Sequence, residues 1–288
     1  MSMDRAARWL KQHSAAERSF ARALRKYFQE QADRTGATVR ENFPGGISPA
    51  MVPLAFDVNA EHEKLRPIVR RNLTGLLAMG AKAELAASER RLEAKDASDE
   101  YEELAALQLP PETLRGLQDA LDQLEAQDYW LNIQNETATN LRQIIEDGIQ
   151  AKLSNYSIGM RIREQLGGMA ANKRAQKIAR TEVTSAMNAG HVAAMQQLGA
   201  EGIVQGKQWL TIGDHDVRDT HQALANKTVR GVNATFDVGG YAAPYPGYFG
   251  LPAGERVHCR CTVISVFSDE VLTGVGADSP VEDAAAAP

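Results

Sequence analysis

Cysteine and histidine side chains that could bind a metal gather in the C-terminal part of the chain. The two cysteines form the sequence Cys259-Arg260-Cys261, and His215 and His221 precede them. Thiolate sulfur and imidazole nitrogen are ligands that zinc prefers in proteins, so these four Cys and His side chains are a possible zinc site. Zinc-binding cysteines are usually spaced C-x2-C rather than C-x-C, which leaves room for a second interpretation.

The second interpretation places both cysteines on an extended strand. The sequence pattern predicts a strand over Arg256–Phe267, in which alternate side chains share one face. Cys259 and Cys261 then point toward the core at positions roughly 6.5–7 Å apart, beyond normal disulfide reach. Free cysteine is among the most buried residue types. We therefore favour two small core side chains and no bound cofactor.

A cluster of charged residues follows a predicted strand that contains Trp209. The sequence D-H-D-V-R-D-T-H begins at Asp214 and ends at His221. Carboxylates beside an imidazole can transfer protons or bind a divalent ion. Equally, Asp214 can cap a short helix, and Arg218 can pair with Glu182 or with a neighbouring Asp. The chain has no G-x-G-x-x-G, Walker, H-E-x-x-H or nucleophile-elbow motif, so we expect no catalytic residues and a protein other than an enzyme.

Basic side chains gather before and within a predicted helix over residues 172–198. The candidate contacts to a nucleic-acid backbone are Arg161, Arg163, Lys173, Arg174 and Lys177. Small apolar residues on the opposite face of this helix suit close packing, so the basic residues can equally form an ordinary solvated face. Residues 151–268 are net basic and residues 41–150 are net acidic. Double-stranded DNA or a charged protein surface is therefore a possible partner.

The elements that must position these residues are mostly helices. Apolar residues at three- and four-residue steps predict helices over residues 4–34 (ended by Gly36), from Asn59 to about Leu92, from Pro111, from Tyr129, and from a cap at Ser157 to Gly167. After Gly202 the pattern changes to extended pieces. These are a strand over Val204–Ile212, a hairpin of Lys227–Val232 with Thr235–Val238, and the strand over Arg256–Phe267.

This order of elements predicts an α+β protein, with a mostly helical N-terminal region followed by a small α+β C-terminal domain that has a short antiparallel sheet. We place the helical region at residues 1–125, the α+β domain at 126–268 and a disordered tail at 269–288. No apolar run is long enough to span a bilayer, and the N-terminus lacks a secretory signal. We therefore expect synthesis in a reducing cytoplasm and no membrane association.

Five separated motifs occur in a fixed order in the C-terminal half. They are A-R-T-E-V-T-S-A-M-N-A-G at 179–190, K-Q-W-L-T at 207–211, D-x-x-V-R-D-T-H at 214–221, F-D-V-G-G at 236–240 and P-x-G-E-R-V-H-C-R-C at 252–261. Together they resemble the phage head morphogenesis domain, the family of the phage Mu F-like minor capsid proteins. This domain is also found as a C-terminal extension of some portal proteins. The resemblance covers roughly residues 130–266.

The resemblance implies a minor capsid protein of a tailed double-stranded DNA phage or prophage, made in the bacterial cytoplasm. It would act in head morphogenesis, bind the portal protein during procapsid assembly, and remain in the virion, in the head interior or at the portal vertex. A major capsid or scaffold protein is another possible partner. No established reaction comes with the family.

The positions that mark the family imply a structural polar centre. They are, in this sequence, Arg180, Thr181, Glu182, Trp209, Asp214, Arg218, His221 and Arg260, together with the two cysteines. His258 stands where relatives often have Asn. An enzymatic alternative remains open: a metal-dependent or nucleotide-modifying, toxin-like enzyme would use the cluster from Asp214 to His221 with Cys259 and Cys261.

Overall fold

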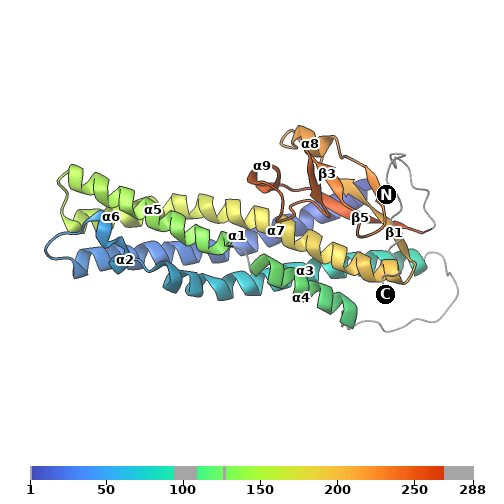
Figure 1. The fold of residues 1–288 in the computed structure, drawn as a ribbon, viewed down its shortest axis with the longest axis horizontal. Helices are drawn as coiled ribbons and strands as arrows, with labels where there is room; N and C mark the ends of the chain where they lie inside the picture. The colour runs from blue at the N-terminus through green and yellow to red at the C-terminus, as the bar shows by residue number, and fades with distance from the viewer. Residues whose placement is uncertain (1, 94–108, 126–127, 269–288) are drawn as a thin grey trace, which may run out of the picture.

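The structure, a computed structural model, describes residues 2–93, 109–125 and 128–268. Long helices lie side by side in an elongated bundle, and a small sheet covers one end of it (Figure 1). The predicted α+β class, with helices first and a short antiparallel sheet near the C-terminus, is confirmed. The tail expected at 269–288 lies outside the described residues. In the part of the chain that the structure describes, no helix has the length and apolar character needed to cross a bilayer.

Six longer helices form the bundle in the described part of the chain. Their bounds are α1 Ser2–Asn42, α3 Val58–Glu93, α4 Pro111–Glu125, α5 Tyr129–Gln150, α6 Asn155–Leu166 and α7 Gly168–Ala200. A 3-10 turn, η1 (Pro49–Met51), and the short helix α2 (Val52–Ala55) connect α1 to α3. The periodic patterns predicted all six helices, because each turns a row of apolar side chains toward its neighbours.

Helix α1 continues through Gly36, where the sequence predicted its end. A Cβ atom at Gly36 would lie 2.6 Å from the carbonyl oxygen of Gly159 in α6, and one at Gly159 would lie 2.5 Å from the carbonyl oxygen of Gly36. The backbones of α1 and α6 touch at this crossing, which leaves no room for a side chain on either residue. The predicted helix end was therefore wrong, because this glycine serves helix packing.

Two helices have different N-caps from those predicted. The carboxylate of Asp57 caps α3, accepting hydrogen bonds from the backbone N–H groups of Asn59 and Ala60 at 2.9 and 3.0 Å. The hydroxyl of Ser154 caps α6, accepting from the N–H of Ser157 at 3.2 Å. The predicted caps, Asn59 and Ser157, lie inside the first turn instead. Because several cap-forming residues stand within one turn, the sequence alone does not select among them.

Helix α7 runs through the centre of the protein. It contacts α1, α3 and α4 on one side and β1 and β5 of the sheet on the other, and every residue over 181–195 is buried. A Cβ atom at Gly190 would lie 2.1 Å from the carbonyl oxygen of Leu77 in α3, and one at Gly80 would meet the α7 backbone at the same distance. The predicted close-packing face of this helix is confirmed.

The sheet has three antiparallel strands in the order β2-β1-β5. Their bounds are β1 Val204–Leu210, β2 Thr228–Arg230 and β5 Thr262–Phe267. A separate ribbon pairs β3 (Phe236–Val238) with β4 (Tyr241–Ala243). The predicted hairpin of 227–232 with 235–238 is therefore wrong. Gly239 and Gly240, with φ values of 60° and 90°, form the tight turn after β3, so β3 pairs with the strand that follows it.

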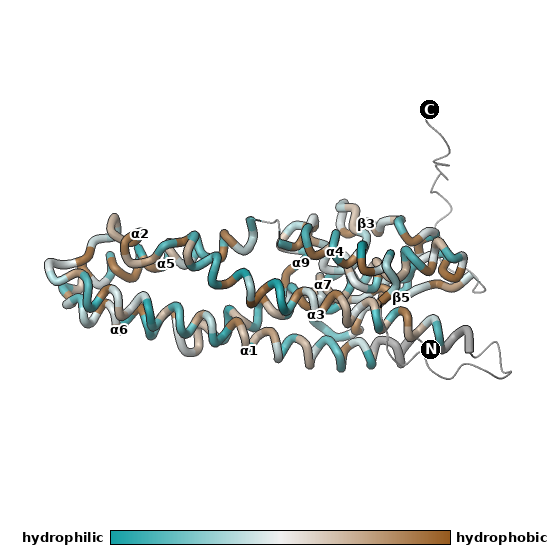
Figure 2. Tube along the Cα trace, turned by 90° about the horizontal axis from the view of Figure 1, so that it is seen from below, coloured by the Kyte–Doolittle hydropathy of each residue, from teal (hydrophilic) through white to brown (hydrophobic). Residues whose placement is uncertain are grey.

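One hydrophobic core joins the bundle to the sheet. Its buried members include Leu24 of α1, Leu73 of α3, Leu121 of α4, Met187 of α7 and Trp209 of β1. A smaller cluster lies at the other end of the bundle, between α1, α2, α5 and α6, and hydrophobic and hydrophilic residues alternate along the helices (Figure 2). Described residues on both sides of the expected boundary between 125 and 126 thus contribute to one core.

Candidate functional site

The two cysteines lie on an irregular segment that connects a helical turn to the sheet. The helical turn is α9 (Ala253–Arg256), and strand β5 begins only at Thr262. Between these elements His258 has a left-handed backbone conformation, with φ of 63°, which turns the chain. The predicted strand from Arg256 is therefore wrong in its first half. Both cysteines are buried in the core, as expected, but they lie before the strand rather than on it.

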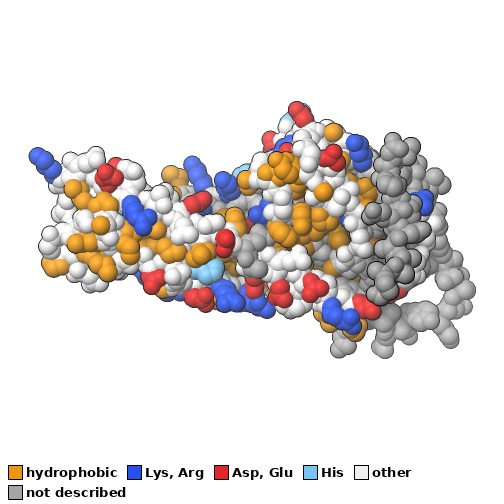
Figure 3. All heavy atoms as spheres, in the orientation of Figure 1, with side chains coloured by type: hydrophobic (Ala, Val, Ile, Leu, Met, Phe, Trp, Pro, Cys, Tyr) orange, Lys and Arg blue, Asp and Glu red, His pale blue; other side chains and the backbone are white. Residues whose placement is uncertain are grey.

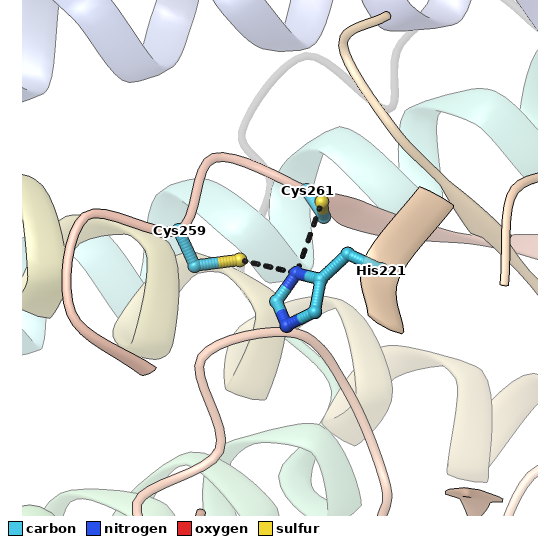
Figure 4. A group of neighbouring side chains, drawn as sticks. All are labelled: His221, Cys259 and Cys261. Atoms are coloured by element: carbon cyan, nitrogen blue, oxygen red, sulfur yellow. Dashed lines mark hydrogen bonds between the residues drawn. The ribbon is translucent and has the colours of Figure 1, made fainter. Parts of the chain in front are cut away.

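Both thiols converge on the imidazole of His221, which lies on the four-residue helix α8 (Asp219–Gln222). Nδ1 of His221 lies 3.6 Å from Sγ of Cys259 and 3.6 Å from Sγ of Cys261 (Figure 4). All three side chains are buried. Their ligand atoms lie within 4.8 Å of one another, a spacing that could hold a metal ion. His215 is exposed and is not part of this group, so the structure brings together three of the four side chains considered.

The other nitrogen of His221 faces a carboxylate. Nε2 lies 3.2 Å from Oε2 of Glu255, and the hydroxyl of Thr220 donates to the same oxygen at 2.8 Å. The ring of Trp209 packs edge-on against the imidazole, with centroids 5.3 Å apart. A proton on Nε2 next to this carboxylate leaves the Nδ1 lone pair directed at the two sulfur atoms.

The two thiols differ sharply in acidity. A hydrogen bond from Cys261, with a smaller contribution from His221, lowers the pKa of Cys259 to about 5, although burial acts in the opposite direction. The same hydrogen bond, together with burial, raises the pKa of Cys261 well above its usual value. The shared hydrogen bond therefore favours ionisation of Cys259 over ionisation of Cys261. A thiolate is the form that binds metals and attacks electrophiles.

Side chains from distant elements hold the irregular segment 257–261, which we call the cysteine segment. Four of its carbonyl groups accept hydrogen bonds from side chains: Val257 from Arg218, Cys259 from Thr184, Arg260 from the indole of Trp9 and Cys261 from Asn188. Because this segment forms no sheet ladder, side chains supply the donors that a neighbouring strand would provide. The positions of both sulfur atoms are fixed by these contacts.

Two of the donors, Thr184 and Asn188, lie one turn apart on the same face of α7. The amide of Asn188 also donates to the carbonyl of Pro246 at 3.0 Å and accepts from the hydroxyl of Thr262 at 2.9 Å. The hydroxyl of Thr184 lies 2.8 Å from Nε2 of His13 in α1. Sequence reasoning missed both residues. The available signal was a row of polar side chains at helical spacing, which includes Thr184 and Asn188, within a helix rich in small apolar residues.

A buried ion pair ties α7 to α9. One guanidinium nitrogen of Arg256 lies 2.8 and 2.6 Å from the two carboxylate oxygens of Glu182, and both side chains are almost fully buried. The guanidinium also lies over the ring of Tyr129, 5.3 Å from its centroid. The expected partner of Glu182 was Arg218, which instead binds the cysteine segment. That expectation was wrong, and sequence reasoning missed Arg256 because it placed this residue at the start of a strand.

The remaining members of the predicted polar centre lie around this pair. Arg180 turns toward α1 and binds Glu17 at 3.0 Å. The hydroxyl of Thr181 accepts a hydrogen bond from the backbone N–H of His258 at 3.2 Å. Arg260 pairs with Asp214 at 2.6 Å near the surface. The motif residues therefore form a continuous set of contacts between α7, α8 and the cysteine segment.

The residues of the predicted basic cluster do not lie together on one exposed surface. Arg163 pairs with Asp33 of α1 at 2.7 Å. Arg174 points inward, donates to the hydroxyl of Thr137 at 2.8 Å, and lies over the ring of Phe28 with its guanidinium carbon 4.6 Å from the centroid. Desolvation by burial lowers the pKa of Arg174. Arg161 is half-buried, whereas Lys173 and Lys177 are exposed.

Comparison with known proteins agrees with the motif order. Residues 136–264 match the family described as Phage Mu protein F like protein. The NAD(+)--arginine ADP-ribosyltransferase EFV of Enterococcus faecalis (strain ATCC 700802 / V583) is 35% identical over 132 residues, which are 46% of this chain and 26% of that protein. The chain thus spans about a quarter of the length of this relative. No solved structure matches. Residues 136–264, which contain α7, the sheet and the cysteine segment, therefore form a domain of the phage Mu F-like family.

Proposed function

We propose that this protein is a minor capsid protein that acts in head morphogenesis of a tailed double-stranded DNA phage or prophage and binds the portal protein during procapsid assembly. The observation that carries this proposal is the family match over residues 136–264. In this role the protein resides in the virion, in the head interior or at the portal vertex. Major capsid or scaffold protein and packaged DNA are further partners of such a protein.

The architecture supports a docking role. Helices α1, α3 and α4 precede the matched domain in sequence but pack directly on α7, so these helices and the domain share one core. The end of the bundle that carries α2 and α6 extends well beyond the sheet (Figure 1). Large apolar side chains are exposed there, among them Leu54 of α2 at 75%, Tyr156 of α6 at 63% and Met169 at the start of α7 at 81%, and hydrophobic side chains are visible over this end in Figure 3. Exposed apolar surface of this kind marks protein–protein contacts.

Co-sedimentation of the purified protein with its cognate portal tests the proposal. We expect a complex that Leu54→Glu with Tyr156→Glu weakens at least about tenfold, the equivalent of roughly 1.4 kcal/mol. Leu114→Glu is the matched control, because Leu114 is 50% exposed but lies on α4. Normal yields of infectious heads from a phage that lacks this gene would contradict the proposal.

An enzymatic role is the alternative, and one observation favours it. Cys259, His221 and Glu255 are arranged as a thiolate, an imidazole and an orienting carboxylate, the order seen in cysteine-based catalysis. Against this, both cysteines are at most 3% exposed, so a substrate has little access to sulfur.

The activity named for the Enterococcus faecalis relative provides a direct assay for this alternative. The protein is incubated with labelled NAD+ and a small guanidino compound. We expect no transfer of ADP-ribose above the rate without protein. Transfer that is lost in Glu182→Gln or His221→Ala, in variants that still melt cooperatively, would replace the structural proposal with the enzymatic one.

A further inference from the structure

We propose that His221, Cys259 and Cys261 bind one zinc ion, which fastens helix α8 to the cysteine segment. The proposal extends beyond head morphogenesis and does not depend on it. It rests on the positions of the three ligand atoms, on the groups behind them and on the contacts that hold the cysteine segment.

The ligand spacing fits a tetrahedral ion. Zinc binds thiolate sulfur at about 2.3 Å and imidazole nitrogen at about 2.0–2.1 Å, so tetrahedral angles place a nitrogen and a sulfur ligand about 3.6 Å apart. Nδ1 of His221 lies 3.6 Å from each of the two sulfur atoms. All three ligand atoms lie within 4.8 Å of one another. The three side chains can therefore bind a zinc ion with little movement.

The groups around the ligands are those of a metal site. A histidine that binds zinc usually directs its other nitrogen at a carboxylate, which fixes the ring and makes it more basic. Glu255 occupies this position next to Nε2 of His221, and Thr220 in turn donates to Glu255. The ring of Trp209 packs edge-on against the imidazole of His221 on the side of the ligands, with centroids 5.3 Å apart.

Contacts with α7 and the backbone conformation hold the two cysteines in position. The hydrogen bonds from Thr184 and Asn188 of α7 fix the carbonyl groups of Cys259 and Cys261. The left-handed conformation of His258 turns the chain after α9, and both thiols that follow face His221 (Figure 4). A core role for two small side chains does not require these constraints, whereas a ligand set that must converge on one point does.

The ion would close the loop of chain that runs from α8 to the cysteine segment. His221 lies 38 residues before Cys259 and 40 before Cys261, and the loop between them carries the separate ribbon of β3 and β4. Helix α8 itself has four residues. A metal that joins the two ends of the loop reduces the freedom of the unfolded chain and stabilises the fold.

Metal analysis of the full chain tests the proposal. The protein is expressed in zinc-supplemented medium, purified without a histidine tag or chelator, and assayed by inductively coupled plasma mass spectrometry. We expect about one equivalent of zinc per chain. His221→Ala, Cys259→Ser and Cys261→Ser should each lose at least about nine-tenths of it. His215→Ala is the matched control and should keep it, because this histidine is exposed six residues earlier on the same segment.

A second measurement keeps the test valid if a cysteine variant does not fold. Wild-type protein is stripped with a chelator and titrated with cobalt(II), which gives intense tetrahedral d–d absorption and a thiolate charge-transfer band with two sulfur ligands. We expect saturation at about one equivalent, displacement by zinc, and a melting temperature roughly 5–10 °C higher in the loaded protein. Less than about half an equivalent of zinc together with two free thiols and no cobalt band would overturn the proposal. So would a disulfide between the two cysteines in freshly purified protein.

Discussion

Replacement of Arg256 by Met should destabilise the protein more than any other single charge removal in the domain. The guanidinium binds both carboxylate oxygens of Glu182, and the two side chains are 8% and 2% exposed. Removing one member of a buried pair leaves an uncompensated charge and costs about 3–5 kcal/mol. Replacing both members by apolar residues of similar volume is often neutral or stabilising. Glu182→Leu with Arg256→Met should therefore recover most of the loss.

The pH dependence identifies the cause of the loss. Burial raises the pKa of Glu182 even in the presence of Arg256, and removal of the cation raises it further. A folded pKa above the unfolded value means that the folded state favours the protonated acid. The Arg256→Met variant should therefore be closest to wild type below about pH 4.5 and should lose stability as the pH rises through the folded pKa. The double variant should lack this trend.

Urea unfolding followed by tryptophan fluorescence measures these free energies, because Trp209 is fully buried in the same domain. Arg230→Met is the control: it removes an exposed arginine from β2 and should change stability by less than about 0.5 kcal/mol. A loss of less than about 1 kcal/mol in Arg256→Met, or a double variant no more stable than the single one, would refute the assignment of a buried, mutually dependent ion pair.

Three further predictions concern packing, protonation and the basic residues. Gly190→Ala should lower the melting temperature sharply, because its Cβ would lie 2.1 Å from an α3 carbonyl oxygen and overpacking costs about 1–3 kcal/mol or more. Gly75→Ala, with open space around it, should instead stabilise α3 by about 0.5–1 kcal/mol. Equal effects of the two substitutions would contradict the close contact between α3 and α7. Burial, with Arg180 and Arg260 nearby, lowers the pKa of His13 to about 4, so folding favours the neutral ring. Urea unfolding at several pH values should show a free energy of unfolding that gains the full contribution of His13 above about pH 6.5 and loses about 3 kcal/mol toward pH 4. A His13→Gln variant with the same pH dependence would contradict this role of His13. Arg174→Met should lower the free energy of unfolding by about 2 kcal/mol through lost hydrogen bonds to buried acceptors, whereas Lys177→Met should change it by less than about 0.5 kcal/mol. If the exposed face of α7 binds duplex DNA, Lys177→Met should weaken that binding, as measured by salt-dependent fluorescence anisotropy.

Local patterns in the sequence were sufficient for most of the fold. The helices were predictable because a 3.6-residue period of apolar side chains is a local property of each segment. The close packing of α7 followed from its small residues in the same way. The ordered motifs were sufficient for the family, since five separated matches in one order constrain each other. Cap positions and the end of α1 were not predictable, because Asn59 and Gly36 have more than one structural use.

The candidate site depended on contacts between residues far apart in the chain. Glu182 meets Arg256 across 74 residues, and nothing local to either residue identifies that partner. The two cysteines meet His221 across 38 and 40 residues, and the alternating pattern around them does not indicate this partner. The sequence by itself determined the helices, the α+β class and the family. The tertiary structure decided the strand pairing, the partner of each buried charge and the meeting of three metal-ligand side chains, because these depend on long-range packing rather than on local periodicity.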